Sequence, residues 1–266
     1  MGGFDLFLFT ADAAIVEEAS RAGIAGFVVD WERRGKQDRQ AGFDTQINAD
    51  DAEDLRRVRA HTARRVLCRI NGVHEGTRAE VETAIACGAD ELLVPMVRRP
   101  AEVEQVLAFA RGRAAVGILV ETLDALAHLE GLCALPLARI YVGLNDLAIE
   151  RGTANLFEAV IDGTTERVRA AFPGAFGFAG LTLPERGRPV PCRLLIAEMA
   201  RLGCSFTMLR RSFLRDTRGL PLATHVPRIQ AALEDAGRRP AERVVEDRRE
   251  LERIVKDTGA GSLGRV

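Results

Sequence analysis

The stretch Ala115-Val116-Gly117-Ile118-Leu119-Val120-Glu121-Thr122 is an apolar run that ends in a carboxylate, and Arg139-Ile140-Tyr141-Val142-Gly143-Leu144-Asn145-Asp146 follows the same pattern. Short β-prone runs of this kind, bounded by glycine or polar residues, are typical of buried strands. The spacing between the two runs is that of one strand-helix-strand unit. We therefore expect Glu121 and Asp146 at neighbouring strand ends, on one rim of a parallel sheet.

A carboxylate at the end of a buried strand needs a cation or a hydrogen-bond partner, because an ionised group is costly to bury alone. Two carboxylates on neighbouring strands, with room for water, are typical ligands of Mg²⁺ or Mn²⁺. Each acid taken alone has a structural alternative: Asp146 would cap the next helix, and Glu121 would pair with an arginine. Taken together, the two acids favour a metal site.

Apolar strands that alternate with helices extend this pattern along the chain. Strands are predicted at Phe4–Phe9, Gly26–Val29, Val66–Ile70, Glu91–Val94, Ala115–Val120, Arg139–Val142, Phe176–Leu181 and Ser205–Leu209. Eight strand-helix repeats, with strands apolar on both faces, predict an α/β fold, a closed TIM (β/α)8 barrel. An open doubly wound sheet is the competitor, but no G-x-G-x-x-G follows the first strand, as a dinucleotide site would require.

The chain changes character after the barrel. We assign residues 1–225 to the barrel catalytic domain and residues 226–266 to a C-terminal helical extension. Charged amphipathic helices are predicted there at Ile229–Ala236 and Ala241–Lys256. The charge run Arg243–Arg253 has two interpretations, a solvated helix face with i,i+4 ion pairs or an arm that packs on a neighbouring subunit.

The amino-acid composition bears on which binding partners and which cellular location we expect. With 37 basic and 38 acidic residues and a net charge of −1, nothing in the charge balance points to nucleic acid or an anionic membrane. The sequence shows neither an apolar segment long enough to span a membrane nor a secretory signal, so we expect no membrane association. Five cysteines without C-x-x-C spacing favour a reducing, cytoplasmic location over a zinc site or a disulfide framework.

The carboxyl ends of the strands form the functional rim of such a barrel. The polar residues expected there carry both signs of charge: Asp30, Glu32, Arg33, Arg69, Asn71, His74, Glu121, Asp146, Thr182 and Arg210. Acids would hold a divalent cation, and arginine would bind an anionic substrate through paired hydrogen bonds. A cation bound to the carboxylate and keto oxygen of a 2-oxo acid would stabilise the enolate formed on proton removal or C–C cleavage.

Several of these residues have a structural alternative. Arg69 is the candidate anion clamp, or else a salt bridge that seals the barrel mouth. Asn71 would orient a loop or a substrate carbonyl, or else be a turn residue. His74 is a candidate base, because histidine titrates near neutrality, or else a solvated loop residue. Asp30 or Glu32 would act instead through a cation-bound water.

Five segments together resemble the HpcH/HpaI aldolase and citrate lyase β-subunit family. They are Ala22–Glu32, Cys68–Gly72 (CRING), Leu92–Val97 (LLVPMV), Ile118–Thr122 (ILVET) and Val142–Leu147 (VGLNDL). The resemblance runs from about residue 15 to residue 215, with the segments in the order and spacing typical of the family.

This resemblance implies a TIM barrel with a Mg²⁺-like metal at Glu121 and Asp146, and an arginine, Arg69, that steadies a pyruvate- or oxaloacetate-like enolate. Members of the family cleave or form C–C bonds next to a 2-oxo acid or a CoA thioester. They are commonly trimers or hexamers whose C-terminal helices contact neighbours, so the resemblance also implies a homo-oligomer.

Three departures from the family pattern concern proton transfer. Arg33 stands where aldolases of the family carry a histidine, and Leu119 stands where many have glutamine. Asp30-Trp31-Glu32-Arg33, with Lys36 nearby, only partly matches the Asp-x-Glu-Asp and lysine of the citrate lyase branch. The loop of residues 35–48 is expected to shape substrate choice.

The leading hypothesis is a divalent-metal-dependent, aldolase-type C–C lyase that acts on a small 2-oxo acid through a pyruvate-like enolate. Its expected residues are Glu121 and Asp146 for Mg²⁺ or Mn²⁺; Arg69, Asn71 and Thr182 for substrate; and Arg69, Glu32, Asp30 and His74 for catalysis. The alternatives are a CoA-thioester lyase and a catalytically silent relative that binds a metabolite.

Overall fold

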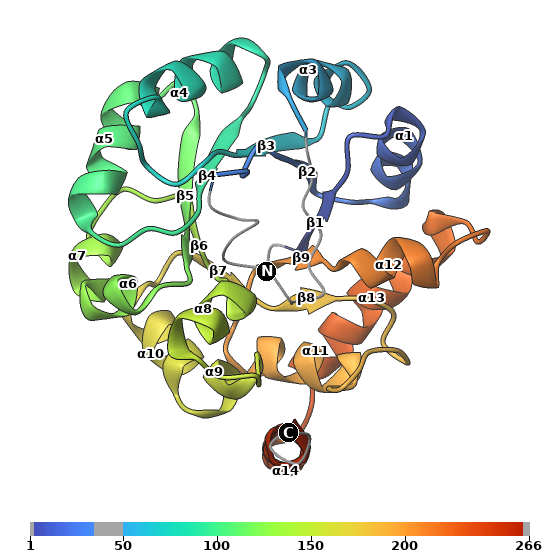
Figure 1. The fold of residues 1–266 in the computed structure, drawn as a ribbon. Helices are drawn as coiled ribbons and strands as arrows, with labels where there is room; N and C mark the ends of the chain where they lie inside the picture. The colour runs from blue at the N-terminus through green and yellow to red at the C-terminus, as the bar shows by residue number, and fades with distance from the viewer. Residues whose placement is uncertain (1–2, 35–49, 263–266) are drawn as a thin grey trace.

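A ring of parallel strands surrounded by helices forms the body of the molecule, seen along its axis in Figure 1. The computed structural model describes residues 3–34 and 50–262, so the predicted substrate loop of residues 35–48 lies outside the described residues. The strands are β1 Asp5–Phe9, β2 Gly26–Asp30, β3 Arg65–Arg69, β4 Glu91–Val94, β5 Ala115–Val120, β6 Arg139–Val142, β7 Ala175–Phe178, β8 Gly180–Leu181 and β9 Phe206–Leu209. Their order around the sheet is β7-β6-β5-β4-β3-β2-β1-β9-β8, with every neighbouring pair parallel.

The barrel closes through the predicted seventh strand, which is kinked. Ala179, with φ +51°, separates β7 from β8; β7 pairs with β6, and β8 pairs with β9. The Thr207 hydroxyl of β9 donates to the carbonyls of Phe178 and Ala179, both at 3.0 Å, where the ladder is interrupted. The two ends of the sheet order, β7 and β8, are the two halves of one kinked strand. The nine strands are therefore equivalent to the eight strands of a closed barrel, and the TIM barrel prediction is confirmed.

The helices follow the strands around the ring. They are α1 Ala13–Ala22, α3 Ala52–Ala60, α4 Thr77–Ala86, α5 Pro100–Ala110, α6 Leu123–Ala127, α7 Leu129–Cys133, α8 Leu144–Arg151, α9 Glu158–Ile161, α10 Thr164–Ala171, α11 Cys192–Arg201, α12 Arg211–Asp216, α13 Leu222–Gly237 and α14 Ala241–Ser262. The sequence of residues Asn155–Phe172 predicts a single helix, and this prediction is wrong, because the structure has two helices there, α9 and α10. Gly163, with φ +92°, lies between α9 and α10 in a left-handed conformation that interrupts helical geometry.

Strand side chains alternate between two apolar layers. One layer fills the barrel interior: Phe7, Val28, Leu67, Leu93, Leu119, Phe206 and Met208. At the N-terminal end of the interior, Arg139 pairs with Glu91 and lies 4.6 Å from the ring centre of Phe7. Arg139 is 2% exposed and Glu91 1%, so this buried ion pair fills the lower end of the barrel and leaves the C-terminal end for a cavity.

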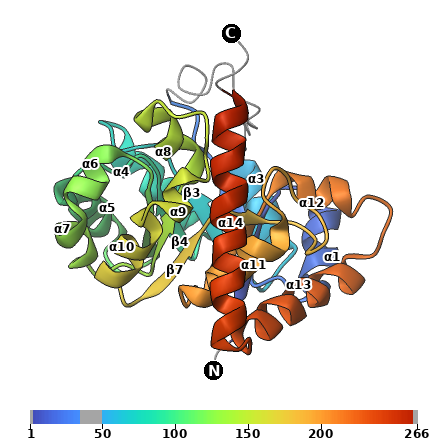
Figure 2. The same ribbon diagram turned by 90° about the horizontal axis from the view of Figure 1, so that it is seen from below.

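Helices α12, α13 and α14 follow the last strand, β9, and α14 lies outside the ring (Figure 1). The domain boundary predicted at residue 225 falls inside α13, which packs on α1 and α11 as the last ring helix. Helix α14 runs across α9 and α11 (Figure 2), with Leu251 and Val255 each 1% exposed. Contact of α14 with a neighbouring subunit stays a prediction. In the described part of the chain, no helix is long and apolar enough to cross a membrane.

Candidate active site

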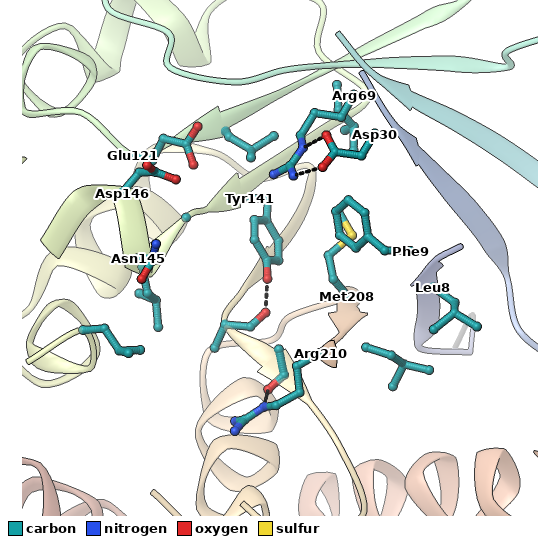
Figure 3. Close-up of a pocket in the computed structure, with 18 of the residues that line it drawn as sticks. Leu8, Phe9, Asp30, Arg69, Glu121, Tyr141, Asn145, Asp146, Met208 and Arg210 are labelled. Atoms are coloured by element: carbon teal, nitrogen blue, oxygen red, sulfur yellow. Dashed lines mark hydrogen bonds and ion pairs between the residues drawn. The ribbon is translucent and has the colours of Figure 1, made fainter. Parts of the chain in front are cut away.

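A cavity of about 450 Å³ opens among the loops at the C-terminal end of the barrel. Barrel-interior residues such as Leu93, Leu119 and Met208 form its floor. Polar side chains from several strand ends line its walls (Figure 3): Asp30, Arg69, Glu121, Tyr141, Asn145, Asp146 and Arg210. Active sites of TIM barrels occupy this end of the fold, so this cavity is the candidate site.

Glu121 and Asp146 lie side by side on one wall of the cavity (Figure 3). Glu121 directly follows β5 and is 2% exposed, while Asp146, in the first turn of α8, is 8% exposed. The Met96 backbone N–H donates to Glu121 Oε1 at 2.8 Å. A Cβ at Gly143 would lie 2.2 Å from Glu121 Oε2, so the glycine leaves the space that the carboxylate occupies.

The surroundings of Glu121 oppose its ionisation. Burial and, to a smaller extent, the neighbouring carboxylates of Asp146 and Glu32 together raise the pKa of Glu121 to about 8, against lowering contributions from the Met96 N–H and Arg69. A cation beside the two carboxylates would offset this repulsion. The pair therefore has the electrostatic character of a cation site.

The donor set fits Mg²⁺ or Mn²⁺ better than zinc. Within residues 3–34 and 50–262, no group of three or more His, Cys, Asp and Glu side chains is arranged to hold a metal. A zinc site needs three or four such protein ligands. Mg²⁺ commonly binds one or two carboxylates and keeps water or substrate oxygens for its other positions, which matches Glu121 and Asp146.

Arg69, the last residue of β3, faces the cavity from another wall (Figure 3). Its Nε donates to Asp30 Oδ1 at 2.8 Å and its Nη2 to Asp30 Oδ2 at 2.7 Å. Asp30, at the end of β2, is fully buried, and the Phe9 ring centre lies 5.0 Å from the guanidinium. This two-point pairing fixes the guanidinium plane, and the side chain lines the cavity as well as joining two strand ends.

Several solved structures have the same barrel architecture. No protein-family model matches the chain, and no curated protein matches it. An HpcH/HpaI aldolase/citrate lyase family protein from Burkholderia cenocepacia J2315 superimposes with a TM-score of 0.62 at 17% identity, over 81% of this chain and 92% of that one. An HpcH/HpaI aldolase from Desulfitobacterium hafniense DCB-2 gives 0.58 at 14% identity, over 90% and 95%. The chain has the fold of the HpcH/HpaI aldolases.

A third structure, citrate synthase SbnG, has the same fold, with a TM-score of 0.59 at 15% identity over 80% of this chain and 89% of that chain. At such identities the likeness concerns the fold. The resemblance carried by the sequence segments is thus confirmed at the level of HpcH/HpaI architecture.

Within this HpcH/HpaI fold, Glu32 and Asn71 are not among the residues that line the cavity. Glu32 is 1% exposed, and its Oε2 is 3.5 Å from Arg69 Nη1. Asn71 Oδ1 accepts hydrogen bonds from the backbone N–H groups of Arg33 and Arg34, both at 2.9 Å. Asn71 therefore orients the chain that follows β2, which is one of the roles expected for it, and neither residue lines the cavity.

His74 and Thr182 lie away from the cavity of the HpcH/HpaI fold. The His74 backbone N–H donates to Thr77 Oγ1 at 2.8 Å, and its ring Nδ1 is 3.2 Å from the same oxygen. Thr182 is fully buried and donates to Asp216 Oδ2 at 2.6 Å. A base role for His74 and a substrate role for Thr182 stay predictions, and neither residue lines the cavity.

Among the described residues, three polar residues that line the cavity were not predicted from the sequence: Tyr141, Asn145 and Arg188. Tyr141 could have been found from the alternation of side chains along its strand. It is paired in register with Leu119, and alternation places both side chains in the barrel interior. Its hydroxyl donates to the Ala179 carbonyl at the kink, and burial raises the pKa of the phenol. Arg188 lies in an irregular loop, where no periodicity indicates its direction.

Proposed function

We propose that this chain is a member of the HpcH/HpaI aldolase/citrate lyase family and a divalent-metal-dependent, aldolase-type carbon–carbon lyase. Its substrate is a small 2-oxo acid, cleaved or formed through a pyruvate-like enolate. One observation carries the proposal: two nearly buried carboxylates, Glu121 and Asp146, share a cavity with Arg69 at the C-terminal end of a barrel with the HpcH/HpaI fold.

Glu121 and Asp146 would hold Mg²⁺ or Mn²⁺. When bound, the cation would polarise the keto oxygen and stabilise the negative charge of the enolate. Glu121 is kept in place for this role by the Met96 N–H and by the space that Gly143 leaves. Because burial favours the neutral form of Glu121, loading of the site is coupled to loss of a proton from that residue.

Arg69 would bind the substrate carboxylate. Its Nε and Nη2 each donate to Asp30, and the second hydrogen of Nη2 and the N–H groups of Nη1, which lies 3.5 Å from Glu32 Oε2, would serve the substrate. Asp30 acts as a positioning residue, because it fixes the plane in which these donors lie. The substrate carboxylate would thus be oriented relative to the two carboxylates on the neighbouring wall, which is the main requirement of a near-attack geometry.

Proton transfer has three candidates from the sequence: Asp30, Glu32 and His74. Only Asp30 lines the cavity, and both of its oxygens accept hydrogen bonds from Arg69. A proton on Asp30 would disrupt that pairing, so Asp30 suits orientation better than base catalysis. No histidine is among the described residues that line the cavity.

This last observation favours a second candidate function, a catalytically silent relative that binds a metabolite. Arg33, in place of the family histidine, points the same way. Such a protein would bind a 2-oxo acid and a cation at the same residues without turnover.

The proposal is tested by pyruvate release from a panel of 4-hydroxy-2-oxo acids and oxaloacetate, with Mn²⁺ or with EDTA. Wild type is compared with Glu121→Ala and with Glu104→Ala, which removes an exposed carboxylate from α5. The lyase function predicts Mn²⁺-dependent release that Glu121→Ala abolishes and Glu104→Ala retains. No pyruvate release from any compound of the panel, in protein that binds Mn²⁺ and pyruvate, would refute the lyase function. The remaining candidates would then be a lyase of CoA thioesters or a protein that only binds its metabolite.

A further inference from the structure

Two arginines line the cavity without a carboxylate within ion-pair distance among the described residues. Arg210 directly follows β9, and its Nε donates to the Gly180 carbonyl at 3.0 Å; its two terminal nitrogens have no ion-pair partner among the residues that the structure describes. Arg188 lies in the loop between β8 and α11, and its side chain is exposed. Arg69, in contrast, is paired with Asp30. The two arginines are therefore cationic groups that the proposed reaction has not yet used.

The loop that carries Arg188 is anchored on both sides of the arginine. Val190 and Cys192, which follow it, are fully buried. Gly187, which precedes it, has φ +102°, and a Cβ there would lie 2.8 Å from the Cys192 nitrogen. This packing holds the loop against the barrel and keeps Arg188 at the cavity.

The charges that line the cavity are divided between two regions. Asp30 offsets Arg69, and Glu121 and Asp146 form the proposed cation site. Among the described residues, the remaining charged groups of the lining are the two arginines, and these give that region a net positive charge. Figure 3 shows Arg210 on the opposite side of Tyr141 from the carboxylate pair.

The kink between β7 and β8 holds both Tyr141 and Arg210 in place. The Tyr141 hydroxyl donates to the Ala179 carbonyl, and Arg210 Nε donates to the carbonyl of the next residue, Gly180. A Cβ at Gly180 would lie 3.0 Å from Arg210 Cβ, so the arginine packs closely on the kinked backbone. The Arg210 guanidinium is therefore held in position by the backbone of the barrel.

The size of the cavity allows a ligand longer than pyruvate. Its volume of about 450 Å³ lies within the roughly 300–1,000 Å³ of pockets that bind drug-sized ligands. A three-carbon acid held at Arg69 and the carboxylate pair would fill only part of it. Tyr141, Met208 and Arg210 are among the residues that line the rest of the cavity (Figure 3).

We propose that Arg210, with Arg188, forms a second anion subsite, so that the substrate carries an anionic group at the end remote from its 2-oxo acid. That group is a carboxylate or a phosphate-type group, because both match the planar donor fork of arginine. The statement about substrate rests on the function proposed above. It makes Arg210 a specificity-determining residue that chooses between anionic and neutral partners of the enolate.

Equilibrium binding tests the subsite without requiring turnover. Isothermal titration calorimetry, with Mn²⁺ and with EDTA, compares 2-oxoglutarate with 2-oxovalerate, and phosphonopyruvate with pyruvate. One anionic ligand is expected to bind on the order of 10- to 100-fold more tightly than its neutral-ended counterpart, the effect of a charge-assisted hydrogen-bond pair. The pair that shows the preference identifies a carboxylate or a phosphate-type group.

Variants assign the preference to Arg210. Arg210→Met is expected to abolish it, and Arg210→Lys to retain part of it, because lysine keeps the charge without the fork. Arg218→Met is the matched control, since it removes an exposed arginine outside the cavity. Circular dichroism checks that each variant is folded. Equal affinities within both ligand pairs, or a preference that Arg210→Met retains in full, would overturn the subsite.

The outcomes separate this inference from the lyase function. An anionic preference that depends on Arg210, without pyruvate release, would support the subsite and refute the lyase. Metal-dependent pyruvate release with equal affinity for anionic and neutral-ended ligands would do the reverse.

Discussion

Replacing Glu121 by glutamine is expected to stabilise the metal-free protein at alkaline pH. In the folded protein burial and, to a smaller extent, neighbouring carboxylates raise the pKa of Glu121 to about 8, against an ordinary value of 4.5. The folded state thus disfavours the ionised form of Glu121. The residue therefore lowers the free energy of unfolding at any pH where its carboxyl group ionises in the unfolded chain. Below pH 4.5 it is protonated in both states and costs nothing; the cost grows between pH 4.5 and 8 and is complete above pH 8.

The size of this effect follows from the change in pKa. At about 1.4 kcal/mol for each tenfold change in proton affinity, the cost above pH 8 is at most about 5 kcal/mol. The buried amide of glutamine has its own desolvation cost, which reduces the gain. We therefore expect Glu121→Gln to raise the free energy of unfolding by about 2–4 kcal/mol at pH 9, and by less than about 1 kcal/mol at pH 5. The amide oxygen retains the hydrogen bond from the Met96 N–H.

Urea unfolding in EDTA, followed by circular dichroism at pH 5 and pH 9, measures the effect. Glu104→Gln, which removes an exposed carboxylate, is the control and should change stability little at either pH. Saturating Mn²⁺ should stabilise wild type and have little effect on Glu121→Gln, because a ligand stabilises only the state that binds it. A Glu121→Gln protein no more stable than wild type at pH 9 would refute the electrostatic account of the site.

Three further variants test other parts of the structure. Gly143→Ala is expected to displace the Glu121 carboxylate, because the new Cβ would lie 2.2 Å from Oε2, and to weaken Mn²⁺ binding by about 10- to 100-fold in calorimetry; unchanged affinity in folded protein would contradict this. Arg69→Lys keeps the charge but loses the paired hydrogen bonds, so pyruvate affinity should fall by on the order of tenfold or more, and an unchanged Kd would exclude the arginine as the anion clamp. Arg139→Met leaves Glu91 buried without its partner and should cost about 3–5 kcal/mol in urea unfolding, whereas a cost under about 1 kcal/mol would show that the pair is unimportant for stability.

The barrel itself could be predicted from the sequence, because apolar runs at regular spacing indicate buried parallel strands and helices between them. The segments around Glu121 and Asp146 also placed the two acids on one rim. Where the backbone departs from regular geometry, prediction failed. Nothing in the residues Phe176–Leu181 signals the left-handed conformation of Ala179, and Gly163 inside an apparent helical pattern was the only hint that α9 and α10 are separate.

Side-chain direction at the rim was harder to predict than position along the chain. One residue more or less at a strand end turns a side chain from the cavity to the helix layer. Thr182 follows the kinked segment and points to Asp216, while Asn71 follows β3 and holds the backbone of Arg33. His74 lies three residues farther into a loop, where no periodicity applies. Contacts between segments distant in sequence decide these directions, and a single sequence does not show them.

Enolate formation is the central claim, and it can be measured without knowing the second substrate. Pyruvate in D₂O with the purified protein and Mn²⁺ is followed by proton NMR, which reports exchange of the methyl hydrogens. We predict exchange that requires both protein and Mn²⁺ and that is lost in Glu121→Ala but kept in Glu104→Ala. Absence of exchange above the Mn²⁺ blank, in protein shown by calorimetry to bind both Mn²⁺ and pyruvate, would contradict the lyase function.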